Sequence, residues 1–395
     1  MSRLEKLIDE LCPDGVEYIK LGDICSIQTG KLNANAMDED GMYPFFTCDK
    51  EPYKINDYAF DTEAILISGN GSQVGHINYY NGKFNAYQRT YVLNNFQNYK
   101  IGFVLHFLKG KLRNYILINS RKGSIPYITL PMLQNFKIPL PPLPVQEEIV
   151  RILDTFAELT AELTAELTMR KQQYEYYHNS LFEFKDCDIE YLPVGALFEF
   201  KNGLNKEKSA FGYGQPFINF TDVYKNRCLT SEKISGLVNV NLNEIESYSA
   251  KKGDVFFTRT SETKEDIGMS SALIEDIPNC VFNGFSIRAR PITDLLLPKF
   301  SAYYFSTNKV RKTIIKYSAF TTRGSITGPK LSKILVPILS LEEQQRIVDI
   351  LDRFDALVND IKTGLPAEIE ARQKQYEYYR DKLLTFKKNE KIMER

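Results

Sequence analysis

The residue types that most often carry chemistry are sparse in this 395-residue chain. Its six cysteines and three histidines are scattered without a Cys-x-x-Cys pair, so neither a disulfide framework nor a zinc site is indicated. One acidic pattern fits a reaction: Asp254, Glu262 and Lys264 have the order found in metal-dependent nucleases, where carboxylates hold Mg²⁺ and a lysine steadies the attacking water. The first half of the chain has no counterpart of this pattern, which counts against a Mg²⁺-dependent nuclease.

The motifs of nucleotide chemistry are missing as well. The sequence contains no G-x-x-x-x-G-K-[ST] phosphate loop and no Asn-Pro-Pro-Tyr/Phe motif for adenine methylation. The glycines Gly69, Gly71 and Gly75 are spaced too loosely for a dinucleotide fingerprint. The sequence therefore lacks the motifs of ATP use and adenine methylation, which points to catalytic partners.

Charge is distributed unevenly although 50 basic and 50 acidic residues cancel. No Asp or Glu occurs from Ala64 to Gln146 or from Leu295 to Leu341, and both segments are rich in Lys and Arg. Uniformly basic segments are typical of surfaces that bind nucleic acid, whereas a solvated surface is the alternative for either segment alone. Because the feature recurs at the same place in both halves, it favours two nucleic-acid-binding surfaces.

Long helices must position these basic segments. Apolar or aromatic residues recur at alternating steps of four and three from Val145 to Lys185, which predicts a heptad seam along one helix of roughly 60 Å. The seam positions are Ile149, Leu153, Phe156, Thr160, Leu163, Leu167, Arg170, Tyr174, Tyr177, Leu181 and Phe184.

A second helical segment repeats the first. Residues 344–354 (QQRIVDILDRF) match 146–156 (QEEIVRILDTF), and 372–386 (RQKQYEYYRDKLLTF) match 170–184 (RKQQYEYYHNSLFEF). Four extra residues in the second copy fall around Gly364 and Pro366, where a proline breaks or kinks a helix. The first helix should therefore be continuous and the second broken in the middle.

The globular halves repeat too. Residues 18–30 match 191–203, two short apolar runs at 64–68 and 255–258 predict buried strands, and basic helices are expected at 104–118 and 303–315. Each half then has a Gly-Ser loop and a proline-containing exit into its long helix. The opening residues align with the tail of a long helix, so the repeat has a cyclic character. The pattern predicts two related domains on one scaffold.

This organisation resembles the specificity subunit of type I restriction-modification enzymes over the whole chain to about Lys388. The resemblance is strongest in the exits PLPPLPVQEEIVRILDTF and VPILSLEEQQRIVDILDRF and in the two QYEYY segments. The repeat TAELTAEL at 160–167 is similar to the spacer of the IC subclass, in which copy number varies the distance between two DNA half-sites.

The resemblance implies an α/β (α+β) fold with two tandem target-recognition domains, separated by two antiparallel coiled-coil spacer helices in a pseudo-twofold arrangement. The expected boundaries are 1–144 and 186–339 for the domains, 145–185 and 340–388 for the spacers, with a break near 364–366, and 389–395 for a tail. Each domain would bind one half of a bipartite, asymmetric duplex DNA target.

The resemblance also implies partners. Two methyltransferase subunits and restriction subunits would join this non-catalytic chain, and S-adenosylmethionine, ATP and Mg²⁺ would belong to them, with no cofactor in this chain. No apolar run is long enough for a membrane span and no signal-like start is present, so a cytoplasmic location away from membranes is expected. The rival is a repeat-built coiled-coil adaptor without DNA binding.

The candidate DNA-binding residues form three groups. The basic helices supply phosphate contacts; the alternative is that their charges only keep the protein soluble. The Gly-Ser loops supply charge and hydroxyl groups; the alternative is that they are ordinary tight turns. Divergent loops supply Arg and Gln side chains that can read guanine or adenine, together with one lysine. In that order the residues are Lys109, Lys111, Arg113, Lys309, Arg311 and Lys312; Arg121, Lys122, Ser124, Arg323 and Ser325; and Gln73, Gln88, Arg89, Arg259 and Lys264.

Overall fold

In the computed structural model the chain divides into two units, each built from one sheet domain and part of the long helices. Unit 1 comprises Met1–Ala165 with Glu368–Arg395, and unit 2 comprises Glu166–Ala367. The structure describes residues 3–119, 126–184, 189–360 and 363–389. Within these ranges no helix is both long and apolar enough to cross a membrane.

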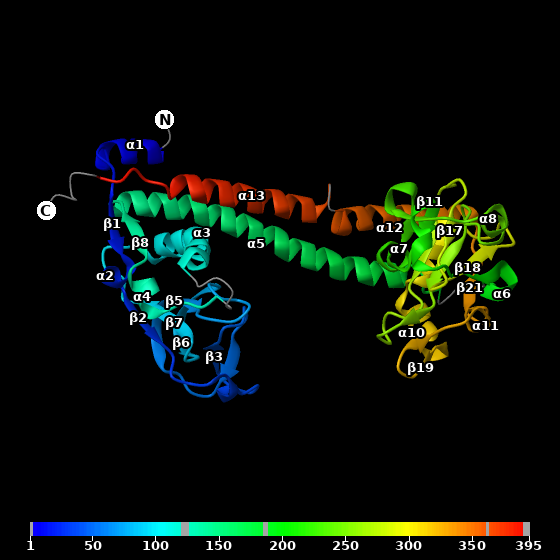
Figure 1. The fold of residues 1–395 in the computed structure, drawn as a ribbon, viewed down its shortest axis with the longest axis horizontal. Coiled ribbons are helices and arrows are strands. Elements are labelled where there is room, and N and C mark those ends of the chain that lie inside the picture. Colours follow the sequence, from blue (N-terminus) through cyan, green and yellow to red (C-terminus); the bar gives the residue numbers. More distant parts are fainter. Residues whose placement is uncertain (1–2, 120–125, 185–188, 361–362, 390–395) are drawn as a thin grey trace. The chain divides into compact units, whose positions relative to one another are not determined.

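Unit 1 carries a six-stranded sheet of order β2-β7-β5-β6-β3-β4 and a separate antiparallel pair, β1 with β8. Its elements before the long helix, in chain order (Figure 1), are α1 (Arg3–Leu11), β1 (Glu17–Lys20), α2 (Leu21–Ile24), β2 (Ser26–Thr29), η1 (Ala34–Ala36), β3 (Tyr43–Phe46), β4 (Tyr53–Ile55), β5 (Phe60–Ser68), β6 (Ile77–Ala86), β7 (Thr90–Asn94), α3 (Ile101–Asn119), α4 (Leu130–Gln134) and β8 (Lys137–Leu140).

The apolar run at the end of β5 explains the layers of unit 1. Ile65 and Ile67 join a core with the buried face of α3, whereas Ala64 and Leu66 on the opposite face join a second cluster around Phe84. Successive strand residues point to opposite faces, so a strand covered on both faces is apolar throughout. The run predicted at 64–68 is therefore a central, fully buried strand.

Unit 2 carries a five-stranded sheet of order β10-β18-β14-β16-β12, two three-stranded sheets, β13-β11-β17 and β15-β20-β19, and the pair β21 with β9. Its elements between the long helices are β9 (Tyr191–Pro193), α6 (Val194–Leu197), β10 (Phe198–Asn202), η2 (Lys208–Ala210), β11 (Phe211–Ile218), α7 (Phe220–Lys225), β12 (Cys228–Leu229), η3 (Ser231–Lys233), β13 (Gly236–Val238), α8 (Leu242–Ser247), β14 (Val255–Thr258), β15 (Thr260–Ser261), β16 (Ser270–Leu273), β17 (Val281–Phe282), β18 (Ser286–Pro291), α9 (Pro298–Phe305), α10 (Asn308–Tyr317), β19 (Ala319–Phe320), β20 (Gly324–Ser325), α11 (Gly328–Leu331) and β21 (Leu335–Pro337).

The two sheet domains share one topology. The order β2-β7-β5-β6 in unit 1 corresponds to β10-β18-β14-β16 in unit 2. A short parallel pair recurs as well, with Phe45 opposite Asn85 in unit 1 and Phe217 opposite Val281 in unit 2. The sequence prediction of two related α/β domains is confirmed.

One predicted helix is divided in the structure. A single helix was expected at 303–315, but α9 ends at Phe305 and α10 begins at Asn308. The hydroxyl of Ser306 donates to the carbonyl of Tyr303, and that of Thr307 to the carbonyl of Tyr304. Such side-chain bonds compete with the helical backbone ladder, so the chain turns here, whereas α3 in unit 1 runs through without a break.

The long helices follow the sequence pattern. The first, α5 (Leu143–Ser180), is continuous, whereas the second is divided into α12 (Leu341–Asn359) and α13 (Leu365–Leu383). Gly364 lies at the break, where a Cβ atom would stand only 2.6 Å from the carbonyl oxygen of Ala356. Glycine is therefore required for the chain to pass this close to the end of α12.

The seam contacts repeat in the two units. In unit 1, α13 lies beside the first part of α5, and Phe156 stacks on Tyr379 with ring centres 5.2 Å apart (Figure 1). In unit 2, α12 lies beside the last part of α5, and Phe354 stacks on Tyr177 at 5.6 Å. The two pairs occupy matching positions of the sequence repeat. Tyr177 and Tyr379 thus pack between helices, as the heptad pattern predicted.

A glutamine fixes the start of each long helix. The side-chain oxygen of Gln146 accepts from the backbone of Lys100, and its amide donates to the carbonyl of Pro141. Gln344 makes the same bonds in unit 2, to Leu297 and Leu339. Both glutamines are fully buried, so their hydrogen bonds tie each exit to its sheet domain.

Candidate nucleic-acid interface

Three loops meet at one edge of the unit 1 sheet. Gly69, just after β5, donates its backbone N–H to the carbonyl of Arg89 at 2.9 Å, and Arg89 immediately precedes β7. Ile128 donates to the carbonyl of Gly69 at 2.8 Å. We call the segments 69, 87–89 and 127–128 the loop edge of unit 1.

The same backbone bonds recur in unit 2. Arg259, just after β14, donates to the carbonyl of Phe285 at 2.7 Å, and Ile326 donates to the carbonyl of Arg259 at 3.0 Å. The segments 259, 283–285 and 325–326 are therefore the loop edge of unit 2. Position 259 corresponds to 69, and 285 to 89.

The loop edge of unit 1 encloses a hollow of about 300 Å³. Arg89 and Gln88 are exposed beside it, and the amide of Gln88 donates to the side-chain oxygen of Asn33 at 2.8 Å. Tyr127 adds an aromatic ring that is 44% exposed. This hollow therefore offers paired donors and acceptors next to an aromatic surface.

A second hollow of unit 1, about 610 Å³, brings three of the predicted residues together. Gln73 comes from the loop after β5, and Lys109 and Arg113 come from one face of α3. Arg113 is exposed, and no hydrogen bond or ion pair joins it to another of the described residues, so its guanidinium is available to a phosphate. Burial of the Lys109 side chain lowers the pKa of its ammonium group, and nearby Asp154 opposes this effect.

The third lysine of this helix points elsewhere. Lys111 lies 3.6 Å from the carboxylate of Asp381 on α13. The sequence grouped Lys111 with Lys109 and Arg113, but residues two apart on a helix face different directions. The structure places Lys111 against the long helix rather than beside the hollow that holds Gln73.

The loop edge of unit 2 has a different composition. A hollow of about 430 Å³ next to it includes Phe285 of the loop edge and is otherwise lined by Phe220, Tyr224, Thr260, Ser261, Glu262, Thr263, Asp266 and Arg323. Arg323 pairs with Glu262 at 3.2 Å, and both side chains are mostly exposed. Ser325 belongs to β20 opposite Thr260, and Lys264 is exposed on the loop between β15 and β16.

Arg311 has a structural task that the sequence did not indicate. It donates to the backbone carbonyls of Glu265, Ile267 and Gly268 at 2.6 to 2.8 Å. Burial lowers the pKa of this guanidinium. Since these donors are already engaged, Arg311 holds the loop before β16, and a phosphate contact would have to break this clamp.

The two candidate lysines of α10 lie beside the long helix. Lys309 and Lys312 line a hollow of about 890 Å³ together with Glu175, Tyr176 and Asn179 of α5. The Lys309 ammonium is 6.0 Å from the ring centre of Tyr191, at the limit of a cation–π contact. Arg121, Lys122 and Ser124 lie outside the described residues.

The nuclease pattern is not assembled. Asp254 and Glu262 lie beyond opposite ends of β14, and Asp254 is buried in a two-point ion pair with Arg290 at 2.7 and 2.8 Å. Among the described residues, no three His, Cys, Asp or Glu side chains are grouped so that they could hold a metal ion. The carboxylates that suggested Mg²⁺ chemistry serve as partners of arginines.

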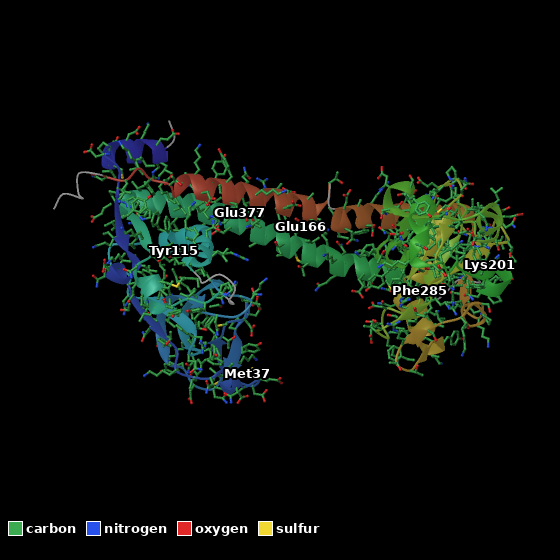
Figure 2. The ribbon with its side chains drawn as sticks, viewed as in Figure 1. Met37, Tyr115, Glu166, Lys201, Phe285 and Glu377 are labelled. Carbon is green, nitrogen blue, oxygen red and sulfur yellow. The ribbon has the colours of Figure 1, made fainter. Side chains whose placement is uncertain are left out.

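Sequence reasoning missed the aromatic residues of the two edges. Phe285 is 58% exposed at the loop edge of unit 2 (labelled in Figure 2), in the place that Arg89 takes in unit 1. Aligning the residue before β7 with the residue before β18 would have identified it. No sequence signal singled out Tyr127.

Two equivalent loop edges with different side chains, on domains joined by repeated helices, define a two-domain scaffold protein with two distinct surfaces. A family model, the type I restriction modification DNA specificity domain, matches residues 13–169 and again 188–371. The chain belongs to this family.

Named relatives agree with this assignment. The chain is 31% identical over 400 residues to a putative type I restriction enzyme specificity subunit of Haemophilus influenzae, covering 97% of this chain and 98% of that protein. It is 29% identical over 433 residues to the EcoR124I/EcoR124II specificity subunit of Escherichia coli, with 99% of each covered.

Among solved structures, the type I S subunit of M. genitalium aligns over 94% of this chain and 96% of its own, with TM-score 0.55 and 15% identity. A chain from a structure on assembly and conformational transition of the type I R-M system aligns over 94% and 97%, with TM-score 0.60 and 17% identity. These likenesses support the fold.

Proposed function

We propose that this chain is the non-catalytic DNA-specificity subunit of a type I restriction-modification enzyme, and that each sheet domain binds one half of a bipartite, asymmetric duplex target. The observation that carries the proposal is the recurrence of one backbone arrangement at both loop edges with different side chains on it. A shared framework fixes position, while side chains with different donors, acceptors and apolar groups read different bases.

Phosphate contacts would come from side chains near each loop edge. Arg113 and Lys109 flank the larger hollow of unit 1, and Arg323 flanks the hollow of unit 2. Positive charge there neutralises the DNA backbone and sets the register of the protein on the duplex. Lys111 and Arg311 contribute less, because Asp381 and three backbone carbonyls already occupy them.

Catalysis would belong to partner subunits. Family membership supports the view that the chain works with other subunits of its system. A similar solved structure, from work on complex assembly of the type I R-M system, supports it as well. We propose two methyltransferase subunits, with restriction subunits joining them, and S-adenosylmethionine, ATP and Mg²⁺ bound by these partners.

An exposed tyrosine that recurs in both units marks the surface for the two methyltransferase subunits. Tyr176 on α5 is 69% exposed and Tyr378 on α13 is 62% exposed, and they occupy the same place in the QYEYY repeat. Each ring stands edge-on to the seam tyrosine that follows it, Tyr177 or Tyr379, at 5.4 and 5.3 Å. Two copies of one surface suit two copies of one partner, and exposed tyrosine is favoured at protein interfaces.

Duplex binding as a function of salt tests the DNA role. The full chain with its partner subunits is titrated with labelled duplex DNA from about 50 to 200 mM salt, where log K should fall linearly with log salt. Arg113→Ala should reduce the slope by about 1, whereas Lys111→Ala on the same helix should change it less. Absence of salt-dependent duplex binding would instead support the coiled-coil adaptor.

A further inference from the structure

The two loop edges carry chemically different side chains at one matched position. Several backbone hydrogen bonds coincide: among them, Ser68 and Thr258 accept from Gly75 and Gly268, and Gly69 and Arg259 donate to residues 89 and 285. The isolated bridge of Leu32 with Tyr87 likewise matches that of Leu204 with Asn283. The side chains of Arg89 and Phe285 therefore project from equivalent backbone positions at corresponding sheet edges.

The neighbouring matched position leaves both of these side chains uncovered. In unit 1 the position beside Arg89 is Gly69, which has no side chain to cover it. In unit 2 that position is Arg259, which is half-buried with its guanidinium 3.5 Å from the carbonyl of Gly284. Arg259 thus lies against its own loop and leaves Phe285 as the projecting side chain.

Arginine and phenylalanine recognise different base edges in the major groove. A guanidinium donates two parallel hydrogen bonds to O6 and N7 of guanine, whereas an aromatic ring contacts the C5 methyl group of thymine and offers no donor. Neither side chain can substitute for the other. A guanidinium placed against a methyl group is left without hydrogen-bond acceptors, and an aromatic ring cannot donate hydrogen bonds to guanine.

Resting on the function proposed above, we infer that Arg89 reads a guanine in the half-site of the first domain and that Phe285 contacts a thymine methyl group in the half-site of the second. The asymmetry of the target then follows in part from this single exchanged position. A first half-site made only of A·T pairs would overturn the arginine assignment.

Base analogues test both assignments. The target is first read from the methylated adenines of DNA exposed to the intact enzyme. Synthetic duplexes then carry 7-deazaguanine, which lacks N7, at single guanines of one half-site, or deoxyuridine, which lacks the methyl group, at single thymines of the other. Binding is measured for the full complex with the wild-type chain, Arg89→Ala, Phe285→Ala and Arg113→Ala.

At one guanine, 7-deazaguanine should weaken wild-type binding about 5- to 100-fold and have no further effect in Arg89→Ala. At one thymine, deoxyuridine should weaken wild-type binding about 3- to 5-fold and have no further effect in Phe285→Ala. Arg113→Ala should weaken binding to every duplex but keep both sensitivities, because phosphate contacts carry no sequence information.

Each outcome decides one claim. If 7-deazaguanine still weakens Arg89→Ala at every guanine, Arg89 is not the guanine reader, and the same logic applies to deoxyuridine and Phe285→Ala. In both cases salt-dependent binding and site-specific methylation would persist, so the proposed function would stand. Loss of all duplex binding by the wild-type complex would remove the proposed function itself.

Discussion

At the scale of single residues, Arg113 and Arg311 show how equal positions acquire unequal roles. Arg113 lies three residues before Ile116, which packs on Gly75 just before β6. Arg311 lies three residues before Ile314, which packs on Gly268 just before β16. In unit 2 the loop before β16 turns its carbonyls to Arg311, whereas in unit 1 Arg113 lines an open hollow. Surface arginine becomes a structural clamp wherever backbone oxygens surround it.

Buried polar groups at the base of each domain are also residue-scale devices. His106 joins α3 to both long helices of unit 1, with one ring nitrogen 2.8 Å from Asp154 and the other 2.8 Å from the hydroxyl of Tyr376. In unit 2 the hydroxyl of Tyr303 donates to Asp352 at 2.6 Å instead. Asp154 and Asp352 occupy matching positions of the repeat, but the partner is the imidazole of His106 in unit 1 and the phenol of Tyr303 in unit 2.

His178 predicts a pH dependence for unit 2. The ring is buried, its Nε2 donates to the carbonyl of Tyr303 at 2.9 Å, and burial lowers its pKa to about 4. The unfolded chain, with a pKa of about 6.5, binds the proton first, so stability is complete above pH 6.5 and is lost as pH falls towards 4. We expect a loss of about 3 kcal/mol from this group between pH 7 and pH 4.

Denaturant unfolding across that range measures the effect. His178→Gln keeps an amide donor near Nε2 but cannot titrate, so its stability should fall less steeply with decreasing pH. Carboxylates protonate in both proteins and cancel in the comparison. Equal slopes for the two chains between pH 6.5 and 5 would contradict the assignment.

At the scale of elements, the long helices have two different faces. The seam face packs helix on helix through pairs such as Phe156 with Tyr379, and residues away from it, Tyr176 and Tyr378 among them, are exposed. Between the two ends, seam positions such as Leu163 and Leu167 are only half-buried, as expected where two helices alone make the core. The helices thus pair along one face and leave another face exposed.

Loss of either exposed tyrosine should remove one methyltransferase subunit. Tyr176→Ala and Tyr378→Ala each delete an aromatic anchor, and truncating such a residue typically weakens an interface by a factor of about 30 or more. Light scattering of the purified complex should then show one bound subunit in place of two. Met169→Ala, 62% exposed on the same helix, serves as control. Full occupancy in both tyrosine variants would show that the partner docks elsewhere.

At the scale of the whole molecule, α5 connects the two sheet domains through the repeated TAEL segment at 160–167. Thr160 and Thr164 each bond back to the carbonyl four residues earlier, and the helix continues through both repeats. Because the segment is continuous helix outside both loop edges, we expect that a change of length by whole repeats leaves either loop edge unaltered. On the proposed function, the spacing of the half-sites and the bases read should therefore be separable properties.

Inserting one further TAEL after Leu167 should lengthen the target spacer. Four residues add about 6 Å of helix, which corresponds to one or two base-pair steps. Sequencing the methylated adenines made by the enzyme carrying this variant should return the same two half-sites with a longer gap. A changed half-site, or an unchanged gap, would show that α5 does not set the distance between them.

The sequence alone determined the repeated architecture, the continuous first helix and broken second helix, and the two basic segments. These features are written in local periods of apolar, proline and charged residues, which act within a few turns of chain. It also supplied candidate residues, but it treated Arg113 like Arg311 and did not find Phe285.

Only the tertiary structure decided which candidates are available and which are matched. Arg311 is occupied by carbonyls more than forty residues away in the chain, and Arg89 corresponds to Phe285 through backbone bonds between separate loops. Hydrogen-bond partners of this kind are fixed by how distant segments meet, and no local pattern records that meeting.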